Sequence, residues 1–221
     1  MCFVQYVVAG LLCVMTFSCR EIEPFTESSS TTDYQFNGIV MDSSGIAIQD
    51  LAVSLYYYYD SVAALPTDTQ QVIVTDSMKV VDITVFTLEH DFISTIFLGF
   101  WHRTGPIQRI WWDGLDWMYR PVGSGMYLIR YYIDTAVVKY SPVVLDGRRT
   151  DTTDRRGRFT IEYNNLPIGK QFDYYDSTGS FRAVYKILPM IKLKLQFPDR
   201  SAMYDSVKLF KDRVTNGTFI L

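Results

Sequence analysis

Apolar and polar residues alternate with a period of two along much of this chain, and this pattern restricts the fold more than any other feature. The alternation is clear in five segments: 51–55, 81–85, 127–133, 159–163 and 191–197. Successive side chains of a strand point to opposite faces of a sheet, so each segment offers one apolar face for burial. Turns rich in Gly and Asp separate these segments. Short strands with frequent turns predict an all-β sandwich fold.

Two distant segments resemble the two halves of one domain family. Residues 34–55 contain a strand with Gly38-x-Val40, an Asp-x-x-Gly turn and a second strand, and residues 150–169 contain Thr-Asp-x-x-Gly-x-Phe-x-Ile followed by Leu-Pro-x-Gly. Together they resemble a carboxypeptidase regulatory-like domain, a β-sandwich that carries no catalytic residues. We therefore expect a host domain at 34–65 plus 148–221 that is split by an insertion.

The inserted segment has motifs of its own. The strand at 81–86, the sequence Trp-Asp-Gly-Leu-Asp at 112–116 and the segment 120–130 resemble the Ig-like module of flagellar hook-cap proteins (FlgD type). We expect this module at 66–147. An insertion at a loop tip is tolerated because loop-closure entropy grows slowly with length and domain termini often lie close together. The expected fold is thus two Ig-like β-sandwich modules, one inserted in the other.

The N-terminus predicts export and a lipid anchor. Residues 1–18 carry no charge and include an apolar run typical of a secretory signal peptide. The run ends at Ser18-Cys19, which resembles a bacterial lipobox and implies that Cys19 is lipidated and becomes the first mature residue. Residues 19–33 are rich in Ser, Thr and Glu and predict a flexible tether. We therefore expect a cell-envelope protein, lipid-anchored to a bacterial membrane, most simply the outer membrane, with the leaflet left open.

Charge and motifs argue against several functions. The net charge of −3 gives no basic surface for nucleic acid, so no nucleic-acid partner is expected. The two histidines, His90 and His102, lie outside any metal-binding or catalytic spacing. We expect no metal site, no cofactor, no catalytic residues and no enzyme activity. Four aspartates near turns are interpreted as turn caps and not as calcium ligands: Asp42, Asp146, Asp151 and Asp154.

Aromatic residues near the second motif are the candidate functional residues. Trp112 is expected in the core, and its neighbour Trp111 faces the other way. Trp117, Met118 and Tyr119 replace a polar turn with three apolar residues at a hairpin tip. They could pack against the host domain or the aromatic run at 56–59, or they could form a contact patch with Trp111 for a protein or a glycan.

These observations leave two functions in competition. The first is a non-catalytic envelope lipoprotein that acts as a structural or protein-interaction module, with a membrane anchor and an envelope protein partner. The alternative is a carbohydrate-binding lipoprotein whose exposed aromatic residues stack on sugar rings.

Overall fold

The chain folds almost entirely into β-strands, and the prediction of an all-β fold is confirmed. The computed structural model describes residues 34–66, 72–75, 78–107, 110–134, 136–176 and 178–221. Within these residues the elements are β1 (Gln35–Met41), β2 (Ala52–Ala63), β3 (Ile73–Val74), β4 (Lys79–Phe86), β5 (Phe92–His102), β6 (Gly105–Pro106), β7 (Gly125–Ile133), β8 (Ala136–Leu145), β9 (Arg148–Thr152), β10 (Arg158–Ile161), the 3-10 helix η1 (Tyr163–Asn165), β11 (Gln171–Tyr175), β12 (Phe181–Gln196), β13 (Ala202–Lys208) and β14 (Val214–Ile220).

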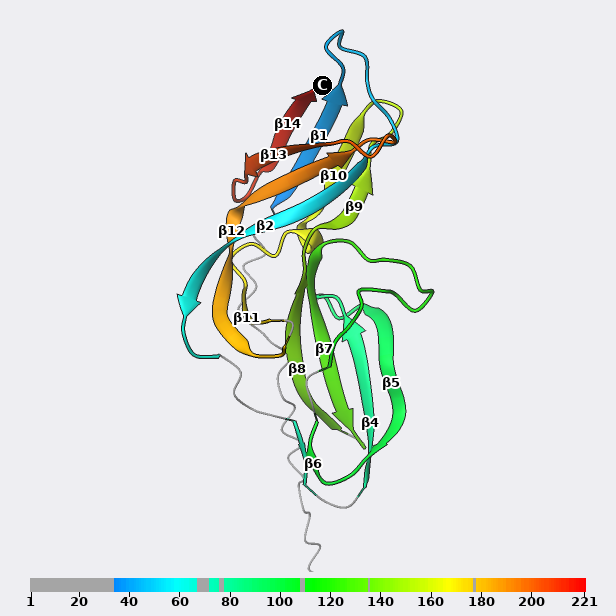
Figure 1. Cartoon of the computed structure of the whole chain (residues 1–221), viewed down its shortest axis with the longest axis vertical. Helices are drawn as coiled ribbons and strands as arrows, with labels where there is room; N and C mark the ends of the chain where they lie inside the picture. The colour runs from blue at the N-terminus through cyan, green and yellow to red at the C-terminus, as the bar shows by residue number, and fades with distance from the viewer. Residues whose placement is uncertain (1–33, 67–71, 76–77, 108–109, 135, 177) are drawn as a thin grey trace, which may run out of the picture.

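One sandwich is formed by two sheets, each of which combines a strand from residues 35–63 with strands from residues 148–220 (Figure 1). The order β10-β1-β14 makes one sheet, and the order β11-β12-β2-β9 makes the other, with β13 paired to β12. The alternation found in the sequence places Leu51, Val53 and Leu55 in the core between these sheets, each at most 1% exposed. β1 is antiparallel to β10 and parallel to the C-terminal strand β14.

The two half-motifs of the sequence meet in this sandwich. Gly38 of β1 lies directly opposite Phe159 of β10. A Cβ atom on Gly38 would lie 2.1 Å from Cε1 of Phe159, so the glycine leaves the space that the ring occupies. The backbone of Val40 also donates a hydrogen bond to the carbonyl of Gly157. These contacts explain why one half-motif carries Gly where the other carries Phe.

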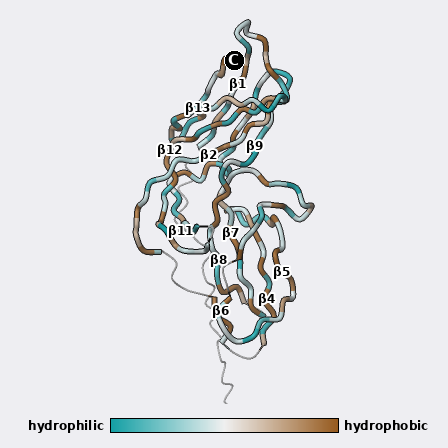
Figure 2. The backbone as a smooth tube through the Cα atoms, viewed as in Figure 1, coloured by the Kyte–Doolittle hydropathy of each residue, from teal (hydrophilic) through white to brown (hydrophobic). Residues whose placement is uncertain are grey.

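A second core lies between the residues of the first core in sequence. Its main sheet has the order β5-β4-β7-β8, and β3 pairs with β6 beside it. Alternate residues of β4 and β7 are buried there together with Trp112, as the sequence predicts. The opposite faces of these strands are not fully exposed, however, because Thr84, Met126 and Leu128 are buried too. The first core draws on residues 36–57 and 159–219, with Met126 of β7 added from the middle segment. Figure 2 shows hydrophobic and hydrophilic stretches alternating along the strands of both parts.

Ser124 connects the two parts through buried hydrogen bonds. Its side chain is fully buried, and its hydroxyl donates to the carbonyl of Leu55 at 2.7 Å and accepts from the amide of Arg148 at 2.8 Å. The side-chain amide of Asn165 donates to the Ser124 carbonyl at 2.7 Å. Because buried polar groups are costly unless paired, this network favours one fixed arrangement of β2, β7 and η1.

The structure differs from the sequence expectation at Tyr163, and the expected N-terminal signal and tether lie outside its described residues. The alternation at 159–163 predicts that Tyr163 belongs to a strand, but β10 ends at Ile161 and Tyr163 begins η1 with about half of its surface exposed, so this detail is wrong. The predicted signal peptide at 1–18, Cys19 and the tether at 19–33 lie outside the described residues. Among the residues that are described, no helix is long and apolar enough to cross a membrane.

Candidate functional site

The candidate residues lie on a short hairpin between β6 and β7. Leu115 and Pro121 form its bridge, and the amide of Val122 donates to the carbonyl of Gly114 at 2.9 Å. At the tip, the amide of Asp116 donates to the Arg120 carbonyl and the amide of Tyr119 donates to the Asp116 carbonyl. The tip is therefore a closed five-residue turn from residue 116 to residue 120.

Asp116 holds this turn together. Its Oδ1 accepts hydrogen bonds from the amides of Met118 at 2.8 Å and Arg120 at 2.9 Å. Its Oδ2 accepts from Nε of Arg120 at 2.8 Å and forms an ion pair with the same guanidinium at 2.7 Å. The backbone hydrogen bond from Arg120, followed by its side chain and the Met118 amide, lowers the pKa of Asp116. Asp116 therefore caps the backbone amides of the turn.

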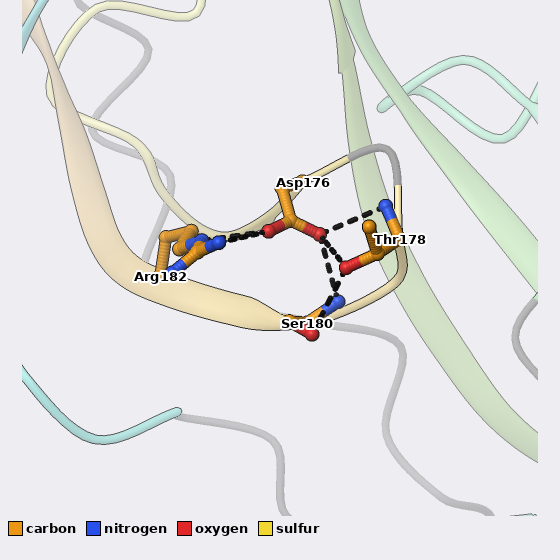
Figure 3. A network of polar contacts seen from close by, with 4 residues as sticks. All are labelled: Asp176, Thr178, Ser180 and Arg182. Atoms are coloured by element: carbon orange, nitrogen blue, oxygen red, sulfur yellow. Dashed lines mark hydrogen bonds and ion pairs between the residues drawn. The ribbon is translucent and has the colours of Figure 1, made fainter.

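The same turn recurs three times elsewhere, starting at Asp42, Asp154 and Asp176. In each, the first carboxylate accepts hydrogen bonds from the amides two and four residues later. Figure 3 shows the Asp176 turn, in which the other carboxylate oxygen accepts from Nε of Arg182 at 2.7 Å. The fourth position of all three turns is a glycine with positive φ, at 79°, 68° and 79° for Gly45, Gly157 and Gly179.

Tyr119 occupies this fourth position in the hairpin turn, and its φ is 61°. This left-handed conformation favours glycine, because a Cβ atom crowds the following carbonyl at a cost of about 1–2 kcal/mol. The Tyr119 side chain gains little in return, since it is 84% exposed. The turns at 87–91 and 197–201 have the same backbone hydrogen bonds and also place non-glycine residues at this position, His90 with φ of 67° and Arg200 with φ of 70°. The hairpin turn differs from all of these in carrying an exposed aromatic ring there.

The two neighbouring tryptophans, Trp111 and Trp112, differ in burial, as their adjacent positions predict. Trp112 is buried, donates from Nε1 to the Leu115 carbonyl at 2.9 Å and packs edge-on against Tyr127. Trp111, Trp117 and Met118 are exposed. The interpretation that Trp117, Met118 and Tyr119 pack against the host domain or the run at 56–59 is therefore wrong. That run packs instead against other residues of its own sandwich, as in the contact of Tyr59 with Phe172.

The hairpin tip adjoins an exposed apolar strand that sequence reasoning missed. The amide of Trp117 donates to the carbonyl of Ile93 in β5 at 2.9 Å. Among the described strands β5 pairs only with β4, so β5 is a sheet edge. We call its large exposed side chains the apolar edge: Phe92, Phe97, Leu98, Phe100 and Trp101. The apolar run at 96–101 was the available signal, but it lacks the alternation used to find strands.

The residues considered for catalysis or metal binding make hydrogen bonds and ring contacts that stabilise turns and strands. His90 lies in the turn at 87–91 with its ring against Tyr140. Asp151 accepts hydrogen bonds from the amides of Thr152 and Thr160, and Asp146 accepts from those of Tyr57 and Gly147. Across the described part of the chain, no three His, Cys, Asp or Glu residues are placed to hold a metal ion.

Comparison with known proteins gives no relative from which a role could be transferred. No protein-family model, curated protein sequence or solved structure matches the chain. The two family resemblances therefore rest on the motifs in the sequence, and the function has to be argued from the site.

Proposed function

We propose that this chain is a non-catalytic envelope lipoprotein that acts as a protein-interaction module, with the hairpin tip as its contact site. In this proposal Cys19 carries the lipid anchor and residues 19–33 form the tether. The host domain at 34–65 plus 148–221 then presents the inserted module at 66–147. Each of these assignments is supported by the sequence motifs described above.

The observation that carries this proposal is the strained and exposed position of Tyr119. Three turns with the same aspartate cap have glycine there. The turns at 87–91 and 197–201 have His90 and Arg200 there instead, so it is the exposed aromatic ring, and not the left-handed conformation alone, that sets Tyr119 apart. Tyr and Trp residues are enriched at the energetic centres of protein interfaces, where a rigid ring fills a pocket of the partner. Trp117 and Tyr119 on one capped turn form such a pair of anchors.

The apolar edge favours a protein partner over a glycan. Trp117 lies beside the start of β5 through its bond to Ile93, so the tip adjoins the strand that carries the apolar edge farther along its length. Exposed strand edges carry unpaired backbone groups that can pair with a strand of another protein. A sugar ring would use the aromatic faces but would leave Leu98 and the backbone of β5 without a role.

Site-specific photocrosslinking in intact cells tests the proposal. A photoreactive phenylalanine analogue replaces Tyr119 in the full chain, and the matched control carries it at Ser44, which lies in the equivalent turn that starts at Asp42. We expect a discrete protein adduct from position 119 that position 44 does not give. Mass spectrometry of the adduct identifies the partner.

Two results would overturn the proposal. Equal adduct patterns from both positions would mean that the hairpin has no preferred partner. An absence of protein adducts, together with binding of the purified chain to a glycan array that is lost in a Trp117→Ser and Tyr119→Ser variant, would establish the carbohydrate-binding alternative.

A further inference from the structure

An aromatic pocket lies away from the hairpin, where the long strands of the first sandwich extend past their partner sheet. β2 and β12 contain 12 and 16 residues, whereas β1, β10 and β14 contain 7, 4 and 7. The far part of the long sheet therefore has no opposing strand from the short sheet. It lies beside β8 instead, as Figure 1 shows for β11, β12 and β8.

The inward face of this extension is lined by aromatic rings. Phe172 lies opposite Tyr185 on the paired strands β11 and β12, so both side chains point to one face. The rings of Tyr59 and Phe172 are 5.5 Å apart, and those of Tyr174 and Tyr185 are also 5.5 Å apart. With Val144 and Asp146 they line a half-open pocket of about 390 Å³. Pockets for small ligands begin at about 300 Å³, so this pocket is large enough for one.

Asp146 supplies a carboxylate to this pocket and is held in place by three hydrogen bonds. Its Oδ1 accepts from the amides of Tyr57 at 3.0 Å and Gly147 at 2.9 Å. Its Oδ2 accepts from the hydroxyl of Tyr59 at 2.9 Å. Desolvation of the carboxylate raises the pKa of Asp146, against the opposing effect of these hydrogen bonds. The pocket thus contains an acidic group that is fixed and only partly hydrated.

We propose that this pocket binds a small organic ammonium cation. The face of an aromatic ring carries negative charge density, and several rings around one site attract a cation strongly when water is displaced. The carboxylate of Asp146 adds a full negative charge on the same side. Among the described residues that line the pocket, none is Lys, Arg or His, so nothing there repels a cation.

The lining is less suited to other ligand classes. An anion would face the carboxylate and the ring faces at once. A sugar needs several donors and acceptors around its hydroxyl groups. The Tyr59 hydroxyl already donates to Asp146, which leaves the hydroxyls of Tyr174 and Tyr185 as the other polar side-chain groups in a wall that is mainly apolar. An alkylated ammonium group matches the site because its surface is apolar while its charge is positive.

Calorimetric titration of the full chain with choline tests this proposal, with 3,3-dimethylbutan-1-ol as a neutral probe of the same shape. We expect choline to bind and the neutral alcohol to bind at least tenfold more weakly. Tyr174→Leu removes a ring at the open side, where Tyr174 is partly exposed and its loss is compatible with folding. This variant should weaken choline binding about fivefold, the size of one cation–π contact. Asp146→Asn should weaken choline binding more than Tyr174→Leu does.

The matched control is Tyr204→Leu on β13, since Tyr204 is similarly exposed but lies outside the pocket. This control should bind choline as the unaltered chain does. Equal affinity for choline and the neutral alcohol would overturn the cationic assignment. Absence of choline binding, or equal losses in the Tyr174 and Tyr204 variants, would overturn the site itself.

Discussion

Replacing Tyr119 with glycine should stabilise the protein, although it removes an aromatic side chain. Relief of the left-handed conformation contributes about 1–2 kcal/mol. The greater freedom of glycine in the unfolded chain takes back about 0.5–1 kcal/mol. The ring is 84% exposed, so little burial is lost, and the bond from the residue 119 amide to the Asp116 carbonyl remains. The expected net gain is about 0–1.5 kcal/mol, the difference between these two ranges.

Urea unfolding of the purified chain measures this gain, and two control variants isolate its cause. Tyr119→Ala removes the ring but keeps a Cβ in the left-handed conformation, so it should give no gain. Gly179→Ala adds the same strain to an equivalent turn, where a Cβ meets no atom within 4 Å. It should lower the free energy of unfolding by about 1 kcal/mol or more.

A Tyr119→Gly variant that is less stable than the unaltered chain would contradict this expectation. In that case the ring of Tyr119 would contribute to folding, and its place in the turn would no longer point to a partner.

Four further predictions follow from the sequence motifs and the fold. Gly38→Ala should lower the free energy of unfolding by about 1–3 kcal/mol through overpacking, and adding Phe159→Leu should restore part of the loss in the same assay. Hydrogen bonds within the turn at 176–180, together with Arg182, lower the pKa of Asp176. The ionised Asp176 carboxylate therefore stabilises the fold above its unfolded-state pKa, and this stabilisation is lost as the pH falls through its folded-state pKa. Asp176→Asn should therefore lower the melting temperature at pH 7, with a difference from the unaltered chain that narrows on acidification. Cys19→Ala should abolish metabolic labelling with a fatty acid and leave unprocessed precursor on a gel. Deletion of residues 66–147, bridged by a short Gly/Ser linker, should leave a β-protein that unfolds cooperatively by circular dichroism, whereas a non-cooperative product would argue for one continuous fold.

The parts of the fold that the sequence predicts are those in which one strand face is buried. Val53 and Ile83 are predictable as core residues because apolar side chains take every second position of β2 and β4 and so share one face of each strand. Trp112 is buried and Trp111 is exposed, as alternation predicts, although neither residue lies in a strand of the structure. Asp116 is predictable as a cap because its hydrogen bonds connect residues of one turn.

The parts that the sequence does not predict depend on tertiary position. β5 is missed because apolar residues occupy both of its faces at 96–101, so its period is hidden. The pocket joins Tyr59 to Tyr174 and Tyr185, which are more than a hundred residues away, and no local pattern relates them. The strain at Tyr119 is invisible until its turn is compared with the Asp-x-x-Gly turns of the same chain.

The most direct test of the proposed contact site places the photoreactive analogue at Met118 and changes Trp117 and Tyr119 to serine in the same chain. Trp117 and Tyr119 are mainly exposed, so the melting temperature of this variant should stay close to that of the chain that carries only the analogue at position 118. We expect the partner adduct to be lost in cells while stability is unchanged. An adduct of undiminished yield would contradict it, because the two aromatic anchors would then contribute nothing to the contact.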